Sequence, residues 1–195
     1  MIRLHCSKAL YDKLPLRDSG RLLSKRPSPY SANDEPETRL SGWHAKPIVL
    51  QRRQCLLFVH DATRFPVFMI GVKMSDFAEL DHRFEDHFMN TLLKTGADDP
   101  LMRAAHAQVG PLVCDTTNNR SVQGTLNHMG QDIKFMLEYE GAKVMDLSPY
   151  RVGAWLADRP CRGKDLGGYV FPIKAMHEWL QHPSTAVLRD DASRP

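Results

Sequence analysis

Three short apolar runs near the middle of the chain constrain its fold more than any other feature. Residues 46–50 (KPIVL), 55–60 (CLLFVH) and 66–72 (PVFMIGV) are each as long as a strand, and only short polar segments separate them. Runs of this length and spacing are typical of an antiparallel meander. Pro66 has no backbone N–H to donate, so the third strand is predicted to lie at a sheet edge or to begin after the proline.

Two further segments are predicted to join this sheet. Residues 2–6 (IRLHC) alternate apolar and polar side chains, which is the period of a half-buried strand. Residues 111–115 (PLVCD) form another apolar run, and 143–147 (KVMDL) is an additional candidate strand. We therefore expect an antiparallel or mixed sheet built from residues 2–6, 46–50, 55–60, 66–72 and 111–115.

The helices are predicted from apolar periodicity. A helix that begins at Ser75 as its N-cap and closes at Gly96 carries one apolar stripe, formed by Phe77, Leu80, Phe84, Phe88 and Leu92. Shorter helices are expected after Pro100 and Pro172, because proline suits the first turn of a helix.

A long helix is predicted from Arg120 to Tyr139, with Gly141 as its stop. Together with the strands, these helices predict an α+β fold in a single domain over residues 1–180. The helices are expected to pack largely on one face of the sheet.

Two segments are predicted to stay outside the folded core. Residues 24–41 hold several prolines and serines and many charged side chains, which is typical of an exposed loop. Residues 181–195 have a similar composition and are expected to form a flexible tail.

Composition excludes several classes of protein. The net charge of +3 is too small to indicate a nucleic-acid partner by itself. The start of the chain is too polar for a signal peptide, and no run approaches the roughly 18 apolar residues that span a bilayer. The four cysteines are widely spaced, which favours free thiols over a disulfide framework. We therefore expect a cytoplasmic protein without a disulfide partner or a membrane contact.

The predicted helix from Arg120 carries an unusual polar face. Val122, Leu126, Met129, Ile133, Met136 and Leu137 fall on one side, and Arg120, Gly124, Asn127, Gln131 and Lys134 fall on the other. The polar side is interpreted either as a solvated back or as a surface that contacts a ligand. The helical period alone favours the solvated back. Glycine and asparagine are poor helix formers, which argues for the ligand, and the preceding asparagine turn suits an anion at a helix N-terminus.

The histidines give no familiar catalytic or metal pattern. No spacing of histidine and cysteine matches a zinc site, so neither a metal nor a cofactor is predicted. His60 and Asp61 could form a dyad, but neighbouring side chains on an extended chain point apart, so a hairpin turn beginning at Asp61 is the better interpretation. His44 precedes the first apolar run and is a further candidate.

Several segments resemble a bacterial domain family of unknown function. The matching pieces are the start MIRLHCSKAL, the WHA before the first strand pair, LLFVHDATRF and, above all, NNRSVQGTLNHM. The resemblance covers most of residues 1–180 and omits the loop at 24–41. It implies a compact bacterial domain that folds as one unit, and it implies no catalytic residue.

Two functional hypotheses follow from these features. The first is a binding or regulatory module for an anionic small molecule, a nucleic acid or a protein partner. The alternative is an enzyme that acts on a phosphate ester or a nucleic acid, with Arg120 and Asn127 as anion contacts and His44, His60 or His128 as acid or base. The candidate ligand-binding residues are Asn118, Asn119, Arg120, Ser121, Gly124, Asn127, His44 and His60.

Overall fold

The structure is a computed structural model that describes residues 1–17, 19–23, 36–163 and 167–181. Most of the predicted loop, residues 24–35, and nearly all of the predicted tail, residues 182–195, lie outside the described residues. Within the described part of the chain, no helix is both long and apolar enough to cross a membrane.

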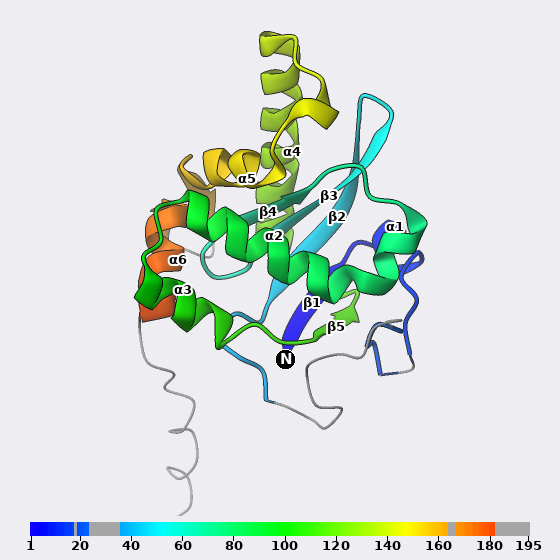
Figure 1. The fold of residues 1–195 in the computed structure, drawn as a ribbon, viewed down its shortest axis with the longest axis vertical. Helices are drawn as coiled ribbons and strands as arrows, with labels where there is room; N and C mark the ends of the chain where they lie inside the picture. The colour runs from blue at the N-terminus through cyan, green and yellow to red at the C-terminus, as the bar shows by residue number, and fades with distance from the viewer. Residues whose placement is uncertain (18, 24–35, 164–166, 182–195) are drawn as a thin grey trace, which may run out of the picture.

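A five-stranded mixed sheet forms the centre of the molecule, in the order β4-β3-β2-β1-β5 (Figure 1). Its strands are β1 (Ile2–Cys6), β2 (Trp43–Leu50), β3 (Arg53–His60), β4 (Pro66–Met69) and β5 (Leu112–Asp115). Strands β2, β3 and β4 pair antiparallel, which confirms the predicted meander. Strand β4 begins at Pro66 and lies at the edge of the sheet, as the proline predicted.

Strand β1 gives the sheet its mixed character, because it pairs parallel with β2 on one side and with β5 on the other. Parallel partners of β1 come from segments that lie far from it in the sequence. His5 is thereby aligned with both His44 and Asp115. This register places three polar side chains in one row across the sheet.

Helices cover both faces of the sheet (Figure 1). The first face packs against α1 (Lys8–Tyr11), α2 (Leu80–Lys94), α3 (Asp99–His106) and α6 (Pro172–Gln181). The second face packs against α4 (Arg120–Glu140) and α5 (Pro149–Ala157). The α+β prediction is confirmed. Most helices contribute to the first face, and α4 is the main element on the other side.

The two faces have separate cores. On the first face, the ring of Trp43 lies 5.0 Å from that of Phe84, and Phe84 stacks on Phe88 at 6.2 Å. On the second face, Leu57 and Val59 of β3 pack with the apolar stripe of α4. Because neighbouring residues of a strand point to opposite sides, the buried strand β3 supplies both cores.

The predicted apolar stripe of α2 is buried, but the start of this helix differs from the prediction. A short 3₁₀ helix, η1 (Met74–Glu79), precedes α2, and Ser75 is not its N-cap. The carboxylate of Asp76 instead accepts a hydrogen bond from the amide of Lys73 at 2.7 Å. Gly96 adopts the left-handed conformation just after α2, with φ of 83°, as predicted for the residue that closes it.

Helix α4 follows its prediction closely. Asn119 caps its first turn, and Gly141 ends it with φ of 60°. The stripe of Val122, Leu126, Met129, Ile133 and Leu137 is buried. Gln131 and Lys134 on the opposite side are exposed.

One other prediction was wrong. Residues 143–147 do not form a strand, because Val144–Asp146 close into a 3₁₀ turn, η2, whose first amide is bonded to Gln51 at 2.8 Å. The last residues of the predicted loop, 36–41, lie in the described part of the chain and contact the domain. Leu40 is buried, and Arg39 contacts Trp179 of α6 through its carbonyl and its guanidinium.

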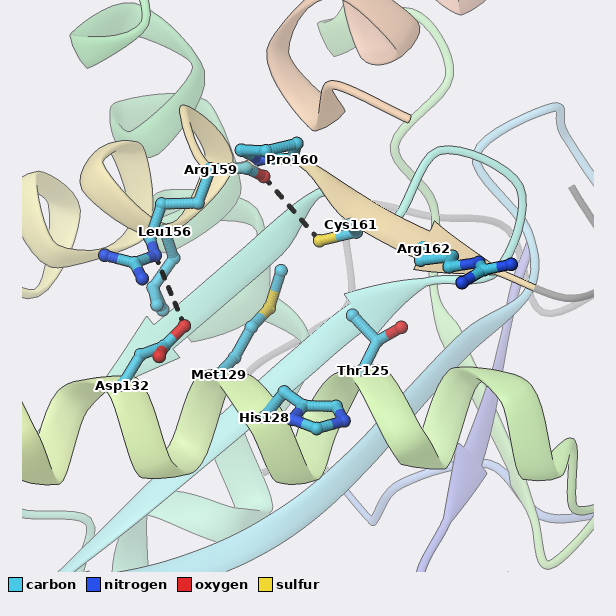
Figure 2. A pocket seen from close by; sticks show the side chains of 9 residues that line it. All are labelled: Thr125, His128, Met129, Asp132, Leu156, Arg159, Pro160, Cys161 and Arg162. Atoms are coloured by element: carbon cyan, nitrogen blue, oxygen red, sulfur yellow. Dashed lines mark hydrogen bonds and ion pairs between the residues drawn. The ribbon is translucent and has the colours of Figure 1, made fainter. Parts of the chain in front are cut away.

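A small second sheet completes the fold. It is the antiparallel pair β6 (Cys161–Gly163) and β7 (Gly168–Val170), which follows α5. Strand β6 runs beside α4 on the second face (Figure 2). Cys6, Cys55 and Cys114 are buried, whereas Cys161 of β6 is only partly buried.

Candidate functional site

Four polar side chains meet at the point where β1 and β5 end and α4 begins. We call them the histidine–aspartate row; its members are His5, His44, Asp61 and Asp115. His5, His44 and Asp115 come from aligned positions of three neighbouring strands, and Asp61 directly follows β3. Their neighbours Leu4, Trp43 and Cys114 belong to the core of the first face, so the row lies on the second face, beside α4.

His5 forms one histidine–aspartate pair with Asp115. Nδ1 of His5 lies 2.7 Å from Oδ1 of Asp115, and the amide of Thr117 donates to the same oxygen at 2.9 Å. Partial burial acts to raise the pKa of Asp115, but the hydrogen bonds from His5 and Thr117 outweigh it, and the net effect is a lowered pKa. Asp115 is therefore an ionised acceptor near neutral pH, and Nδ1 of His5 carries a proton.

His44 forms a second pair with Asp61. Nδ1 of His44 lies 2.7 Å from Oδ1 of Asp61, and Nε2 accepts a hydrogen bond from the amide of Asn119 at 2.9 Å. Because a backbone amide can only donate, Nε2 of His44 must be unprotonated, which assigns the proton to Nδ1. Both ring nitrogens are therefore satisfied within the chain. His44 is almost fully buried and fixes the start of α4 over the sheet.

The second ring nitrogen of His5 is in a different situation. Nε2 of His5 lies 3.7 Å from Oδ2 of Asp61, which is too long for a hydrogen bond, and no described residue bonds to it. The rings of His5 and His44 are 4.8 Å apart. Side-chain exposure is 12% for His5 and 28% for Asp61, so this nitrogen and this carboxylate form a partly open polar pair.

The first turn of α4 is closed by its own side chains. Oδ1 of Asn119 accepts from the amides of Ser121 and Val122, at 2.9 and 3.4 Å. The hydroxyl of Ser121 accepts from the buried guanidinium of Arg64 at 3.3 Å, and Arg64 also donates to the carbonyl of Asp61. The amides of Ser121 and Val122 are therefore engaged within the chain, so an anion at this helix start would be held mainly by side chains.

The structure brings some of the predicted ligand residues together at the row. Asn118, Asn119 and Arg120 form an exposed rim directly above it, and Ser121 lies behind them. His44 contacts this rim through the amide of Asn119. These five candidates share one region of the molecule.

Gly124 and Asn127 lie farther along α4. Asn127 lies seven positions after Arg120 in the helix, which corresponds to about 10 Å along the axis. The side chain of Asn127 accepts from Lys46 of β2. A Cβ atom at Gly124 would find no atom within 4 Å, so no part of the described chain approaches it closely.

His60 lies on the other face of the sheet. Its ring packs between Trp43 at 5.0 Å and Trp179 at 5.9 Å, and Nδ1 contacts the hydroxyl of Thr63 at 2.9 Å. Complete burial lowers its pKa to about 4, against the opposing charge of Asp61. His60 is therefore a buried core histidine, and the structure does not bring it to the row. The turn predicted to begin at Asp61 is present.

Sequence reasoning missed His5 and Asp115, and it considered Asp61 only with its neighbour His60. The available signal was weak: His5 occupies a polar position of an alternating strand, and Asp115 ends an apolar run. Their partnership depends on the parallel pairing of β1 with β5, and local patterns do not encode such a pairing.

A cavity of about 390 Å³ lies on the other flank of α4 (Figure 2). Met129 of α4 and Leu156 of α5, both buried, form its apolar side. Asp132 and Arg159 pair at 3.3 Å at one end, and Thr125 and Arg162 lie toward the other (Figure 2). In the described part of the chain, no group of three or more histidine, cysteine, aspartate or glutamate side chains could hold a metal ion.

The sequence profile of a domain of unknown function, DUF6933, matches residues 3–175. The chain belongs to the DUF6933 family. The match includes β1, the row and both flanks of α4, so the site described above is part of the DUF6933 domain itself. This confirms the resemblance to a family of unknown function. No curated protein and no solved structure matches the chain.

Proposed function

We propose that this DUF6933 protein is a binding module for a small anionic molecule that also carries a hydrogen-bond donor. The observation that carries the proposal is Nε2 of His5, which has no hydrogen-bond partner among the described residues although Asp115 fixes Nδ1. In neutral His5 this nitrogen is an acceptor, and Oδ2 of Asp61 beside it is a second acceptor. Two adjacent acceptors suit a hydroxyl or an amine of the ligand.

The anionic group is assigned to the rim of the row. Arg120 is exposed at the first position of α4, and its guanidinium can hold a carboxylate or phosphate with two hydrogen bonds. Asn118 beside it can donate through its amide group. The positive end of the α4 dipole adds to the attraction, although the amides of Ser121 and Val122 are already bonded to Asn119.

A small molecule is preferred over a nucleic acid or a protein partner because the central acceptors are only partly exposed. A ligand must insert a small polar group between the rim and the sheet to reach Nε2 of His5. In this proposal His44 is a positioning residue, because both of its ring nitrogens are used inside the chain.

The test uses phosphoethanolamine, which carries both an ammonium and a phosphate, with ethanolamine and inorganic phosphate as single-group controls. Imidazole nitrogen resonances of His5 are followed by NMR. We expect phosphoethanolamine to shift them at concentrations where neither control does. Arg120→Gln should weaken this response, and Arg103→Gln, an exposed arginine on α3, should not. An unchanged His5 resonance at saturating probe would refute the site.

The geometry of His5 also supports a second candidate function, an enzyme that hydrolyses a phosphate ester. An imidazole that donates through Nδ1 to a carboxylate and leaves Nε2 open can accept a proton from an attacking water. His5 then replaces His44, His60 and His128 as the base, and Asn127 lies too far along α4 to share its site. Hydrolysis of p-nitrophenyl phosphate that disappears in His5→Gln would favour the enzyme over the binding module.

We further propose a cytoplasmic location. The support is the burial of Cys6, Cys55 and Cys114 as free thiols in the strands of the sheet, an arrangement that suits a reducing compartment. The location is tested by separating lysed cells into fractions and detecting the protein, which should be found in the cytoplasmic fraction.

A further inference from the structure

The cavity beside α4 is separate from the histidine–aspartate row and has a different chemistry. Thr125, His128, Met129 and Asp132 project from α4 at spacings of three and four residues, so they share one side of the helix. The opposite wall is formed by the end of α5 and by β6 (Figure 2). The cavity is therefore enclosed by three elements: α4, the end of α5 and β6.

The cavity has an apolar side and a polar edge. Among the residues that line the cavity, Pro160 is exposed and Cys161 is partly exposed, so these two offer accessible apolar surface, whereas Met129 and Leu156 are buried and only close the wall. The volume of about 390 Å³ falls within the range of cavities that hold small molecules. A ligand of this size could place an apolar body against Pro160 and Cys161 without rearrangement of the core.

The charged side chains that line the cavity carry more positive than negative charge. Asp132 is the one carboxylate among the described residues that line the cavity, and Arg159 lies 3.3 Å from it. The guanidinium of Arg159 also lies over the ring of Trp155, at 4.9 Å. Arg159 is thus occupied on two sides. Arg162 is exposed at the other end and forms no ion pair with any described residue.

We propose that this cavity binds a small molecule with an apolar body and one anionic group. The apolar body lies against Pro160 and Cys161, and the anionic group lies beside Arg162. His128, exposed on the same side of α4, adds a hydrogen bond to the anion. A carboxylate, a sulfonate and a phosphate ester share the chemistry that Arg162 recognises. The site does not depend on the proposed function of the row.

Cys161 provides an internal reporter of occupancy. It lines the cavity, and it is the one partly exposed cysteine, because the other three thiols are buried. Burial raises the pKa of Cys161 to about 11, so alkylation is slow at neutral pH and is best measured under mildly alkaline conditions. A molecule that fills the cavity is expected to shield this thiol.

The experiment uses anilinonaphthalene sulfonate as the anionic probe and phenyl-naphthylamine, which has the same rings without the sulfonate, as its uncharged counterpart. Fluorescence titration of the folded protein should show saturable binding of the sulfonate at one site. The uncharged probe should bind about tenfold more weakly, because it lacks the charged hydrogen bond to Arg162. Alkylation of Cys161 by iodoacetamide, followed by mass spectrometry, should slow in proportion to the bound fraction.

Two variants sharpen the test. Arg162→Gln should weaken binding of the sulfonate about tenfold and leave the uncharged probe unchanged. Arg151→Gln removes an exposed arginine of α5 that does not line the cavity, and it should change neither. Saturating probe without protection of Cys161 would place the probe elsewhere and overturn the site. Protection that is equal for both probes and insensitive to Arg162→Gln would overturn the anionic ligand.

Discussion

The two faces of the sheet use neighbouring residues of the same strands for opposite purposes. Trp43 and His60 point into an aromatic core with Phe84, whereas the residues next to them, His44 and Asp61, belong to the histidine–aspartate row. The first face is closed by several helices, and the row at the end of β1 stays partly open. The difference teaches that the alternation of a strand can separate a buried aromatic core from a row of polar side chains in this fold. The predictions below test how complete this separation is.

The largest effect is expected from a cavity in the aromatic core. Phe84→Ala removes a side chain that packs against Trp43, Phe58 and Phe88, and it should lower the free energy of unfolding by about 3–5 kcal/mol. His5→Gln in the row should cost less, about 1.5–3 kcal/mol, the net contribution of a hydrogen bond to a charged group such as the carboxylate of Asp115. Urea denaturation followed by circular dichroism measures both. Equal losses would mean that the row is part of the structural core.

Acid should act mainly through the first face, which holds the buried His60. Burial holds the pKa of His60 at about 4, below its ordinary value of 6.5, so the unfolded chain takes up a proton that the folded chain excludes. The stability that neutral His60 provides is complete above pH 6.5 and is lost as the pH falls toward 4. Since one pKa unit corresponds to about 1.4 kcal/mol, the loss is about 3 kcal/mol.

His87 and His177 contribute to this acid sensitivity with the same sign, because burial lowers the pKa of each. Unfolding free energies measured between pH 7 and pH 4 should therefore fall steadily for the natural protein and less steeply for His60→Gln. His106→Gln, which removes an exposed histidine, is the matched control. An unchanged slope in His60→Gln would show that His60 is not the buried neutral group described here.

Much of this fold could be predicted from the sequence because its signals are local. The meander follows from three apolar runs, and the stripe of α4 follows from helical spacing. The place of β1 between β2 and β5 could not be predicted, because its partners lie about 40 and 110 residues away along the chain. The partnership of His5 with Asp115 depends on that register, so only the rim of the site, residues 118–121, and His44 were found. The 3₁₀ turn at Val144 likewise depends on a distant side chain, Gln51.

A smaller effect should separate the two asparagines at the start of α4. The side chain of Asn119 caps the helix, and Asn119→Ala should therefore cost about 1 kcal/mol of stability. Asn118→Ala removes an exposed amide with no such role and should leave the unfolding free energy unchanged while it weakens the proposed binding at the rim. Thermal unfolding and the phosphoethanolamine titration together decide this. Equal destabilisation by both changes would assign Asn118 to the fold.

An effect of about the same size as that of the helix cap, but of opposite sign, is expected at Gly124. Alanine favours a helix interior over glycine by about 1 kcal/mol, and a Cβ at this position meets no atom within 4 Å. Gly124→Ala should therefore raise the unfolding free energy slightly, which urea denaturation can resolve. A stabilised variant with unchanged probe binding would show that the glycine belongs to neither site. A stabilised variant that binds either probe less tightly would show that the glycine leaves room on α4 for a ligand.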